Sequence, residues 1–341
     1  MKIEIVTLDS RKVPLVKLEE GDEAVIVSDL HFGLRYKGRF LTKFKEFENF
    51  LRHLAGKPPS LLILLGDVFE LWSAKAKDVF ATAYASLREL AKLDCKMIYV
   101  AGNHDHVVAH LDRMSFFEND NLLISPEYIV LESSGLKGLL FHGHQLDWKF
   151  IRFKWLWRTE PYIYLLSESL SALPWSTEWI LAVGYALLFL SFISITSRAP
   201  LSLRFVAVAS ALLLTAPFII LSWRKIQDKF WYGLVQPLTY QMFKSRLRGK
   251  ALKSEPVSKA LRNLLSLVEE SGLGNTDFVI FGHTHVPGLH EVEKGRIVAN
   301  TGSWIEDEEG FCCTFVKIKD RKITLTRWNG SAGENLMEIT L

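Results

Sequence analysis

The chain has few cysteines and no strong excess of charge. Cys95, Cys312 and Cys313, its three cysteines, have neither zinc-ligand spacing nor the even number of a disulfide framework, so we interpret them as reduced thiols in a reducing compartment. The net charge is only +3 and no basic run exceeds a few residues, which argues against polynucleotide binding. Residues 1–7 lack the apolar stretch of a secretory signal, so we expect a strand there. No internal repeat or low-complexity segment is present, which argues against a repeat architecture.

Short apolar runs alternate with helix-period segments over most of the chain. Five runs have the length and composition of buried strands: residues 24–28, 61–65, 96–100, 139–141 and 277–281. Helical periodicity lies near 40–55 and 78–93. This order predicts an α/β fold, in which ligands bind at the carboxyl edge of the sheet.

A polar motif follows each of these runs. In chain order the motifs are Asp29-Leu30-His31, Gly66-Asp67, Gly102-Asn103-His104-Asp105, His142-Gly143-His144 and Gly282-His283-Thr284-His285. Asp and His suit Mn²⁺, Fe, Zn²⁺ or Mg²⁺, and Asn adds an amide oxygen. Each motif alone is weakly specific, but all five together predict two adjacent divalent metals that hold a phosphoryl group between them.

The spacing within the motifs suggests how the donors are arranged. Asp67 is the natural bridging carboxylate, because a Gly-Asp turn at a strand end lets the backbone come close to both metals. Asp29 and His31 are separated by one residue, so we expect them to face the same way from an extended strand end. His283 and His285 repeat this spacing.

The middle of the chain differs in kind. Residues 179–197 and 205–223 contain no charged side chain, and each run is long enough for a helix to cross about 30 Å of hydrocarbon. Seven of the ten tryptophans fall between Trp148 and Trp231, where an interfacial aromatic belt would lie. We therefore expect a transmembrane hairpin within a helical cap insertion at 148–250, between catalytic segments 1–147 and 251–341. A buried hairpin in a soluble cap, or an apolar hairpin that docks on one leaflet or on a partner, are the alternatives.

Basic residues flank the hairpin on the side of the catalytic segments. They are Lys149, Arg152, Lys154 and Arg158 before it and Arg224, Lys225 and Lys229 after it. This excess favours a multi-pass protein of the cell membrane with a cytoplasmic catalytic domain. Two arginines in the linker, Arg198 and Arg204, weaken the orientation without reversing it. The bilayer is thus an expected partner, and the hairpin also offers a surface for homo-oligomers.

The five motifs resemble the calcineurin-like metallophosphoesterase superfamily, over about 1–147 and 256–305. Within it, Gly66-Asp67-Val68-Phe69-Glu70-Leu71-Trp72 looks like the corresponding stretch of UDP-2,3-diacylglucosamine hydrolases, which are membrane-associated pyrophosphatases. The resemblance implies a four-layer α/β/β/α sandwich with the site at one sheet edge. Two departures, His104 in place of an arginine and His144 in place of an aspartate, bring the site closer to the general superfamily pattern.

The superfamily pattern implies a role for each donor. The first metal would be held by Asp29, His31, Asp67 and His285, and the second by Asp67, Asn103, His142 and His283. His104 would be a transition-state stabiliser or general acid, and Asp105 would orient it through a ring-nitrogen hydrogen bond. Three further residues, His144, Glu70 and Trp72, are candidates for substrate contacts. His144 is also an alternative ligand to His142.

These features predict an integral membrane phosphoesterase with two divalent ions, most simply Mn²⁺, that acts as a phosphodiesterase or pyrophosphatase. A site held at the bilayer surface favours an amphiphilic phosphoester, lipid-linked or nucleotide-linked. One alternative keeps the chemistry but takes soluble nucleotides, nucleic acid ends or phosphoproteins as substrates. A second alternative is a non-catalytic membrane scaffold.

Overall fold

The computed structural model describes residues 1–8, 11–36, 39–71, 74, 76–113, 121–146, 184, 275–292, 295–306 and 312–341. By its contacts the chain divides into two units, Met1–Tyr164 with Leu247–Leu341 and Leu165–Arg246. Apart from Gly184, every described residue belongs to the first unit. Apart from Gly184, the expected cap at 148–250 and both apolar runs of the hairpin therefore lie outside the described residues, and they stay predictions. Among the described residues, no helix is long and apolar enough to span a membrane.

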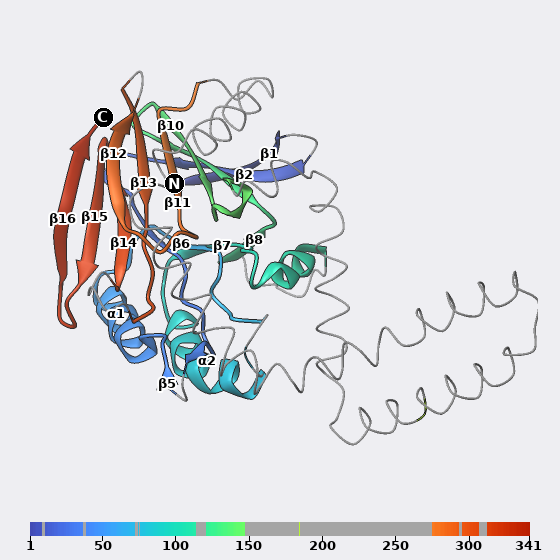
Figure 1. The fold of residues 1–341 in the computed structure, drawn as a ribbon. Coiled ribbons are helices and arrows are strands. Elements are labelled where there is room, and N and C mark those ends of the chain that lie inside the picture. Colours follow the sequence, from blue (N-terminus) through green and yellow to red (C-terminus); the bar gives the residue numbers. More distant parts are fainter. Residues whose placement is uncertain are drawn as a thin grey trace, which may run out of the picture. The chain divides into compact units, whose positions relative to one another are not determined.

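Two seven-stranded sheets form the body of this unit (Figure 1). The first has the order β1 (Lys2–Leu8), β2 (Arg11–Leu18), β9 (Tyr128–Ser133), β10 (Leu136–Phe141), β11 (Phe278–Phe281), β13 (Arg296–Asn300) and β12 (Gly288–Val292). The second has the order β16 (Gly333–Thr340), β15 (Lys322–Trp328), β14 (Thr314–Lys319), β3 (Glu23–Val27), β6 (Leu61–Leu65), β7 (Lys96–Val100) and β8 (Leu122–Ser125). A small hairpin joins β4 (Arg35–Tyr36) to β5 (Arg39–Phe40).

The helices are short and amphipathic. They are α1 (Phe44–Gly56), α2 (Ala76–Leu90) and the 3₁₀ turns η1 (His106–Arg113) and η2 (His144–Leu146). In α1 the buried side chains are Phe47, Phe50, Leu51 and Leu54, at the spacing that places them on one face of a helix. That face packs on the second sheet beside α2 (Figure 1). The helices expected near 40–55 and 78–93 and the five expected strands are confirmed.

Alternation along the strands separates two layers of the core. Val25 and Val27 of β3 pack in the cluster of α1. Ala24 and Ile26 point the other way and meet the first sheet, where Phe278 is one of their cluster partners. Full burial of a large apolar side chain such as Val25, Ile26 or Phe278 contributes about 1.5–3 kcal/mol relative to exposure. The described residues thus contain one helical layer and two packed sheets, three of the four expected layers, and the fourth stays a prediction.

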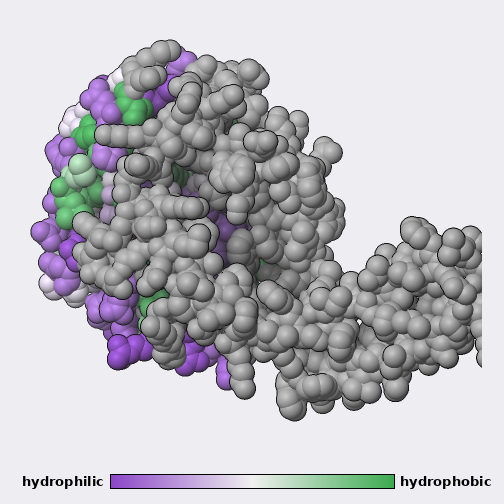
Figure 2. Space-filling view, in the orientation of Figure 1, coloured by the Kyte–Doolittle hydropathy of each residue, from purple (hydrophilic) through white to green (hydrophobic). Residues whose placement is uncertain are grey.

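Large apolar side chains of the described residues lie mainly inside. In the view of Figure 2, the described surface is mostly hydrophilic, with smaller hydrophobic areas between the polar ones. Exposed exceptions include Leu336 and Met337 on the edge strand β16, and Phe80 and Tyr84 on α2. The hydrophobic content of this part of the chain is therefore explained largely by its buried core, whose residues form three clusters.

The strand directions place the polar motifs together. The adjacent strands β3, β6 and β7 run parallel in the second sheet, and β10, β11 and β13 run parallel in the first. Parallel neighbours end at the same edge, and ligands of α/β sheets bind beyond that carboxyl edge. The residues after β3, β6, β7, β10 and β11 are those of the five motifs.

Candidate metal centre

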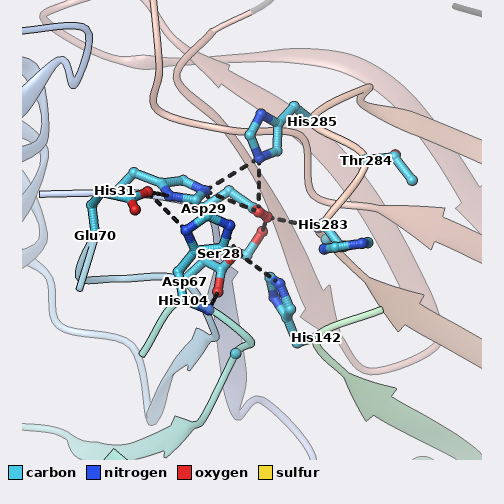
Figure 3. Close-up of polar contacts among 12 residues, drawn as sticks. Ser28, Asp29, His31, Asp67, Glu70, His104, His142, His283, Thr284 and His285 are labelled. Atoms are coloured by element: carbon cyan, nitrogen blue, oxygen red, sulfur yellow. Dashed lines mark hydrogen bonds and ion pairs between the residues drawn. The ribbon is translucent and has the colours of Figure 1, made fainter. Parts of the chain in front are cut away.

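The structure brings donors from both sheets into one cluster (Figure 3). Three groups have ligand atoms that all lie within 4.8 Å of one another: Asp29 with His31 and His285, His31 with Asp67 and His104, and Asp67 with His142 and His283. Asp67 and His31 are each common to two groups, and Asp67 is the carboxylate of the two, which is the type of ligand expected to bridge. The expected pairing of His285 with Asp29, and of His142 and His283 with Asp67, matches this grouping.

Individual distances fit ligands that surround a cation. His285 Nε2 lies 3.1 Å from Asp29 Oδ1, His142 Nε2 lies 3.1 Å from Asp67 Oδ2, and His31 Nε2 lies 3.6 Å from Asp67 Oδ2. The Nε2 atoms of His31 and His285 are 3.3 Å apart. Ligands about 2.0–2.2 Å from one ion, at tetrahedral or octahedral angles, are separated by roughly 3.0–3.5 Å. The spacing is that of donors that share a metal.

Several of these atoms are buried without a hydrogen bond. Asn103 Oδ1, Asp29 Oδ1 and His142 Nε2 are all inaccessible to solvent and lack a hydrogen-bond partner among the described residues. An unsatisfied buried polar group costs about 1–3 kcal/mol. Asp29 Oδ1 and His142 Nε2 belong to the donor groups, and Asn103 directly precedes His104, whose N–H donates to Asp67 Oδ1. A bound cation is the partner that would satisfy such metal-type donors. The donor set thus fits divalent metal ions.

Backbone conformation, rather than extended strand geometry, aims the paired ligands. Asp29 and His31 have φ of 54° and 45°, and His283 and His285 have φ of 65° and 58°. Asp67 also lies in this left-handed region, with φ of 52°. Non-glycine residues rarely adopt such angles, and they persist at functional sites where the surroundings hold them. The expectation that Asp29 and His31 leave an extended strand end is therefore wrong, although both side chains do reach one centre.

The histidine rings are held with Nε2 free to face the metals. His31 donates from Nδ1 to Glu70 Oε2 at 2.9 Å, and His142 donates from Nδ1 to the carbonyl of Leu65 at 3.0 Å. Because a carboxylate or carbonyl can only accept, Nδ1 carries a proton in each ring, and Nε2 is the nitrogen that faces the other donors. Such partners orient metal-binding histidines and raise their basicity.

Glu70 also holds the ring of His104. Glu70 Oε2 lies 2.8 Å from His104 Nδ1, and the His104 ring stands edge-on to His31 with 4.8 Å between centroids (Figure 3). Glu70 is only 1% exposed, so it lies behind the imidazoles rather than in an open substrate groove. Burial alone would lower the pKa of His104, but Glu70 and then Asp67 outweigh burial and raise that pKa.

The hydrogen bonds of Asp105 differ from the expected ones. Its carboxylate accepts hydrogen bonds from the backbone N–H groups of Asp67, Val68, Phe69 and Gly102, at 3.3, 2.7, 3.2 and 2.7 Å, and from the Tyr99 hydroxyl. The carboxylate at His104 Nδ1 is that of Glu70. Asp105 therefore fixes the Gly-Asp turn that carries Asp67, and the expectation that it orients His104 through a ring nitrogen is corrected.

Of the remaining candidates for substrate contact, the structure describes His144 but not Trp72. His144 is buried, and its ring centroid lies 5.6 Å from that of His142 and 6.4 Å from that of His283. Burial, and then the neighbouring His142 and His283, hold the pKa of His144 well below its ordinary value. His142, not His144, belongs to the donor groups. Trp72 lies outside the described residues, so its expected contact stays a prediction.

The loop that follows β13 supports the metal donors, and no chemistry was predicted there from the sequence. Ser28 Oγ donates to Asp29 Oδ2 and lies 2.6 Å from Thr301 Oγ1. The Trp304 N–H donates to the Asp29 carbonyl at 3.1 Å, and Asn300 Nδ2 donates to the Gly282 carbonyl at 2.8 Å. These bonds fix the loops that carry Asp29 and His283.

Close packing explains why glycine begins three of the five motifs. A Cβ atom on Gly102 would lie 2.2 Å from Asp67 Oδ1, and one on Gly282 would lie 2.2 Å from Ser28 Oγ. Neither position has room for a side chain, because carboxylates or their partners pass directly over the backbone. Glycine directly before Asp67, Asn103 and His283 was the signal in the sequence for this close approach.

Two mixed sheets with buried Asp and His donors at their carboxyl edges define a metal-binding hydrolytic centre. The chain belongs to the calcineurin-like phosphoesterase family, whose model matches residues 24–208. It is therefore a metal-dependent phosphoester hydrolase, and the alternative of a non-catalytic scaffold is set aside. The match ends before His283 and His285, which join the site through the fold.

Solved structures of similar proteins were also found. The chain is 13% identical to YfcE, a phosphoesterase from E. coli, with 93% of this chain and 98% of that chain covered and a TM-score of 0.41. It is 13% identical to an archaeal phosphodiesterase, with 94% and 99% covered and a TM-score of 0.36. A dimetal phosphatase from Danio rerio is 11% identical, with 94% and 99% covered and a TM-score of 0.42. A search of curated protein sequences found no match.

Proposed function

We propose that the protein hydrolyses a phosphodiester or pyrophosphate bond of a lipid-linked or nucleotide-linked substrate at a membrane surface. The observation that carries the chemistry is the cluster of Asp29, Asp67 and their histidine partners at the carboxyl edges of the two sheets. The membrane part is supported by the two uncharged runs that the sequence places between His142 and His283.

The donors divide into two sets with a shared member. Asp29, His31, Asp67 and His285 would hold one divalent ion, and Asp67, Asn103, His142 and His283 the other. Mn²⁺ is the proposed ion, since carboxylate, amide and imidazole donors suit it. When bound, such ions supply Lewis-acid activation and neutralise charge on the phosphoryl oxygens.

His104 is the proposed proton donor of the reaction. A quarter of its side chain is exposed, whereas Asp29, His31 and Asp67 are buried. Glu70 Oε2 lies 2.8 Å from Nδ1, and Nε2 is the nitrogen that would face a substrate. With a raised pKa, the ring keeps a proton that it can deliver to the leaving-group oxygen, which is the role of a general acid.

The test is a substrate panel with the full chain purified in detergent. Bis-p-nitrophenyl phosphate, p-nitrophenyl phosphate and a nucleotide-linked lipid pyrophosphate are assayed with added Mn²⁺, each against Asp67→Asn. The lipid substrate is paired with a short-chain analogue that has the same headgroup. A higher kcat/KM for the long-chain member, lost in Asp67→Asn, supports the proposal. Equal turnover of both members, or turnover of soluble diesters alone, would leave the phosphoesterase and refute the lipid preference.

The proposed location is tested independently of turnover. We expect the full chain in the membrane fraction after alkaline carbonate washing, with its catalytic unit protected from protease added outside intact cells. Release by carbonate would contradict an integral hairpin, and digestion in intact cells would contradict a cytoplasmic catalytic unit. Cross-linking in the same membranes would test the expected homo-oligomer.

A further inference from the structure

A pair of adjacent cysteines lies at the start of β14, outside the metal centre. Cys313 is buried and Cys312 is partly exposed, and both thiols are free. The Cys313 thiol donates a hydrogen bond to the Cys312 sulfur, with 3.5 Å between the two Sγ atoms. The sulfur of Cys312, which is nearer to solvent, therefore accepts a hydrogen bond from the thiol of Cys313.

The surroundings of Cys312 favour its thiolate. The hydrogen bond from Cys313 lowers the pKa of Cys312 to about 6, with Lys43 and Arg327 adding positive charge nearby. The same hydrogen bond, and then burial, raise the pKa of Cys313. Partly exposed cysteines in electropositive surroundings are the reactive ones, because the thiolate is the nucleophile. The pair therefore has one attacking sulfur and one protonated partner.

We propose that Cys312 and Cys313 form a second reactive site, a vicinal dithiol that is oxidised by hydroperoxides. The Cys312 thiolate attacks the O–O bond of the hydroperoxide, so that an S–O bond forms and the alcohol, or water from hydrogen peroxide, leaves with a proton. The Cys313 sulfur then attacks the sulfenic sulfur of Cys312. An S–S bond forms, the S–O bond breaks, and the Cys313 proton leaves with the hydroxide as water. In total, two thiols and one hydroperoxide give a disulfide, an alcohol and water.

Oxidation at this position must disturb the backbone. Adjacent Cα atoms are about 3.8 Å apart across a trans peptide, whereas disulfides usually join Cα atoms about 4.4–6.8 Å apart. Cys313 already has φ of 64°, in the left-handed region. A strained disulfide of this kind is more easily reduced than a structural one, so the oxidation is reversible by dithiols.

The disturbed backbone is tied to the metal centre by a short chain of hydrogen bonds. The Cys313 N–H donates to the Ser303 carbonyl at 2.8 Å. The next residue, Trp304, donates its N–H to the Asp29 carbonyl at 3.1 Å. The Thr314 hydroxyl binds the Thr301 carbonyl at 2.7 Å, and Thr301 contacts Ser28 beside Asp29. Movement at Cys313 therefore displaces the loop that supports the first metal.

Hydrogen peroxide titration of the full chain in detergent tests the site. Metal-free protein is treated, denatured and assayed for free thiols, with peptide mass mapping of the oxidised residues. We expect two of the three thiols to be lost and then recovered with dithiothreitol. Cys312→Ser should lose none, Cys313→Ser should hold a sulfenate on Cys312 that dimedone traps, and Cys95→Ser should match the wild type in disulfide formation. Loss of Cys95 at the same rate as the pair, or no disulfide at peroxide concentrations that oxidise free cysteine, would overturn the proposal.

A second measurement needs no variant. The rate at which iodoacetamide alkylates Cys312 in the reduced wild type should rise with pH through a midpoint below the ordinary thiol pKa of about 8.5, well ahead of Cys95. A midpoint at or above that value would overturn the assignment of Cys312 as the attacking sulfur. The coupling to the metal centre is read from Mn²⁺ affinity before and after oxidation. Unchanged affinity in the disulfide form would refute that coupling.

Discussion

Glu70 Oε2 lies 2.9 Å from His31 Nδ1 and 2.8 Å from His104 Nδ1, so one carboxylate contacts two imidazoles. Glu70→Gln keeps the shape of the side chain but removes its charge. Hydrogen bonds to charged groups contribute about 1.5–3 kcal/mol and neutral ones about 0.5–1.5 kcal/mol. Each contact should therefore lose about 1 kcal/mol or slightly more, and the two together about 2–3 kcal/mol. At about 1.4 kcal/mol per tenfold, kcat/KM should fall roughly 30- to 160-fold.

The assay separates the two consequences of this substitution. Substrates with a p-nitrophenyl leaving group need little protonation, whereas an alkyl leaving group needs an acid. If Glu70 orients His104, kcat/KM should fall further for the substrate with the alkyl leaving group than for the p-nitrophenyl substrate. If Glu70 supports His31, the affinity for Mn²⁺ should also fall, by about 10- to 100-fold. Glu48→Gln, which alters a surface ion pair with Arg52, is the matched control. A change below about threefold in both substrates and in affinity would refute the shared role, since mutations behind metal ligands normally exceed it.

Two further substitutions test the packing and the close approach at the site. Gly102→Ala would place a Cβ 2.2 Å from Asp67 Oδ1 and 2.4 Å from the Asp67 backbone nitrogen, so both the manganese stoichiometry and the unfolding midpoint should fall. Gly56→Ala, with no atom within 4 Å of the added Cβ, is the control, and equal metal content in both variants would contradict the steric argument. Phe50→Ala, at 1% exposure between α1 and the sheet, should lower the free energy of unfolding by about 3–5 kcal/mol in urea titrations. Phe80→Ala, at a side chain 68% exposed, should change it by less than about 0.5 kcal/mol, and comparable losses in both would be inconsistent with the core described above.

Much of the fold follows from local patterns. The apolar runs at 61–65 and 96–100 coincide with β6 and β7, because buried parallel strands carry apolar residues on both faces. The edge strand β16 was not anticipated, since its side chains are mostly exposed and mixed in character. Strands of that kind owe their position to pairing with β15, which is a tertiary interaction.

The sequence also predicted which residues form the metal centre, but it did not predict the contacts among them. Asp67 was expected to be shared, and the structure places it in two donor groups. Asp105, in the same motif as His104, was expected to contact the His104 ring. Instead the Asp105 carboxylate accepts hydrogen bonds from backbone N–H groups, and the carboxylate beside His104 Nδ1 is that of Glu70. Residue spacing cannot choose between two carboxylates that both lie near one ring, because side-chain direction depends on the left-handed turn at Asp67.

Strain and unsatisfied donors at the centre lead to a last prediction, that metal binding stabilises the fold. Five donor residues lie in the left-handed region, and buried atoms such as Asn103 Oδ1 lack a hydrogen bond among the described residues. A ligand that binds only the folded state adds about 2.7 kcal/mol at one hundred times its Kd. Thermal unfolding of the full chain in detergent should therefore shift upward with Mn²⁺ in a concentration-dependent way, and Asp67→Asn should lose most of the shift because it weakens both sets. An equal shift in Asp67→Asn would mean that the ion stabilises the protein from another site.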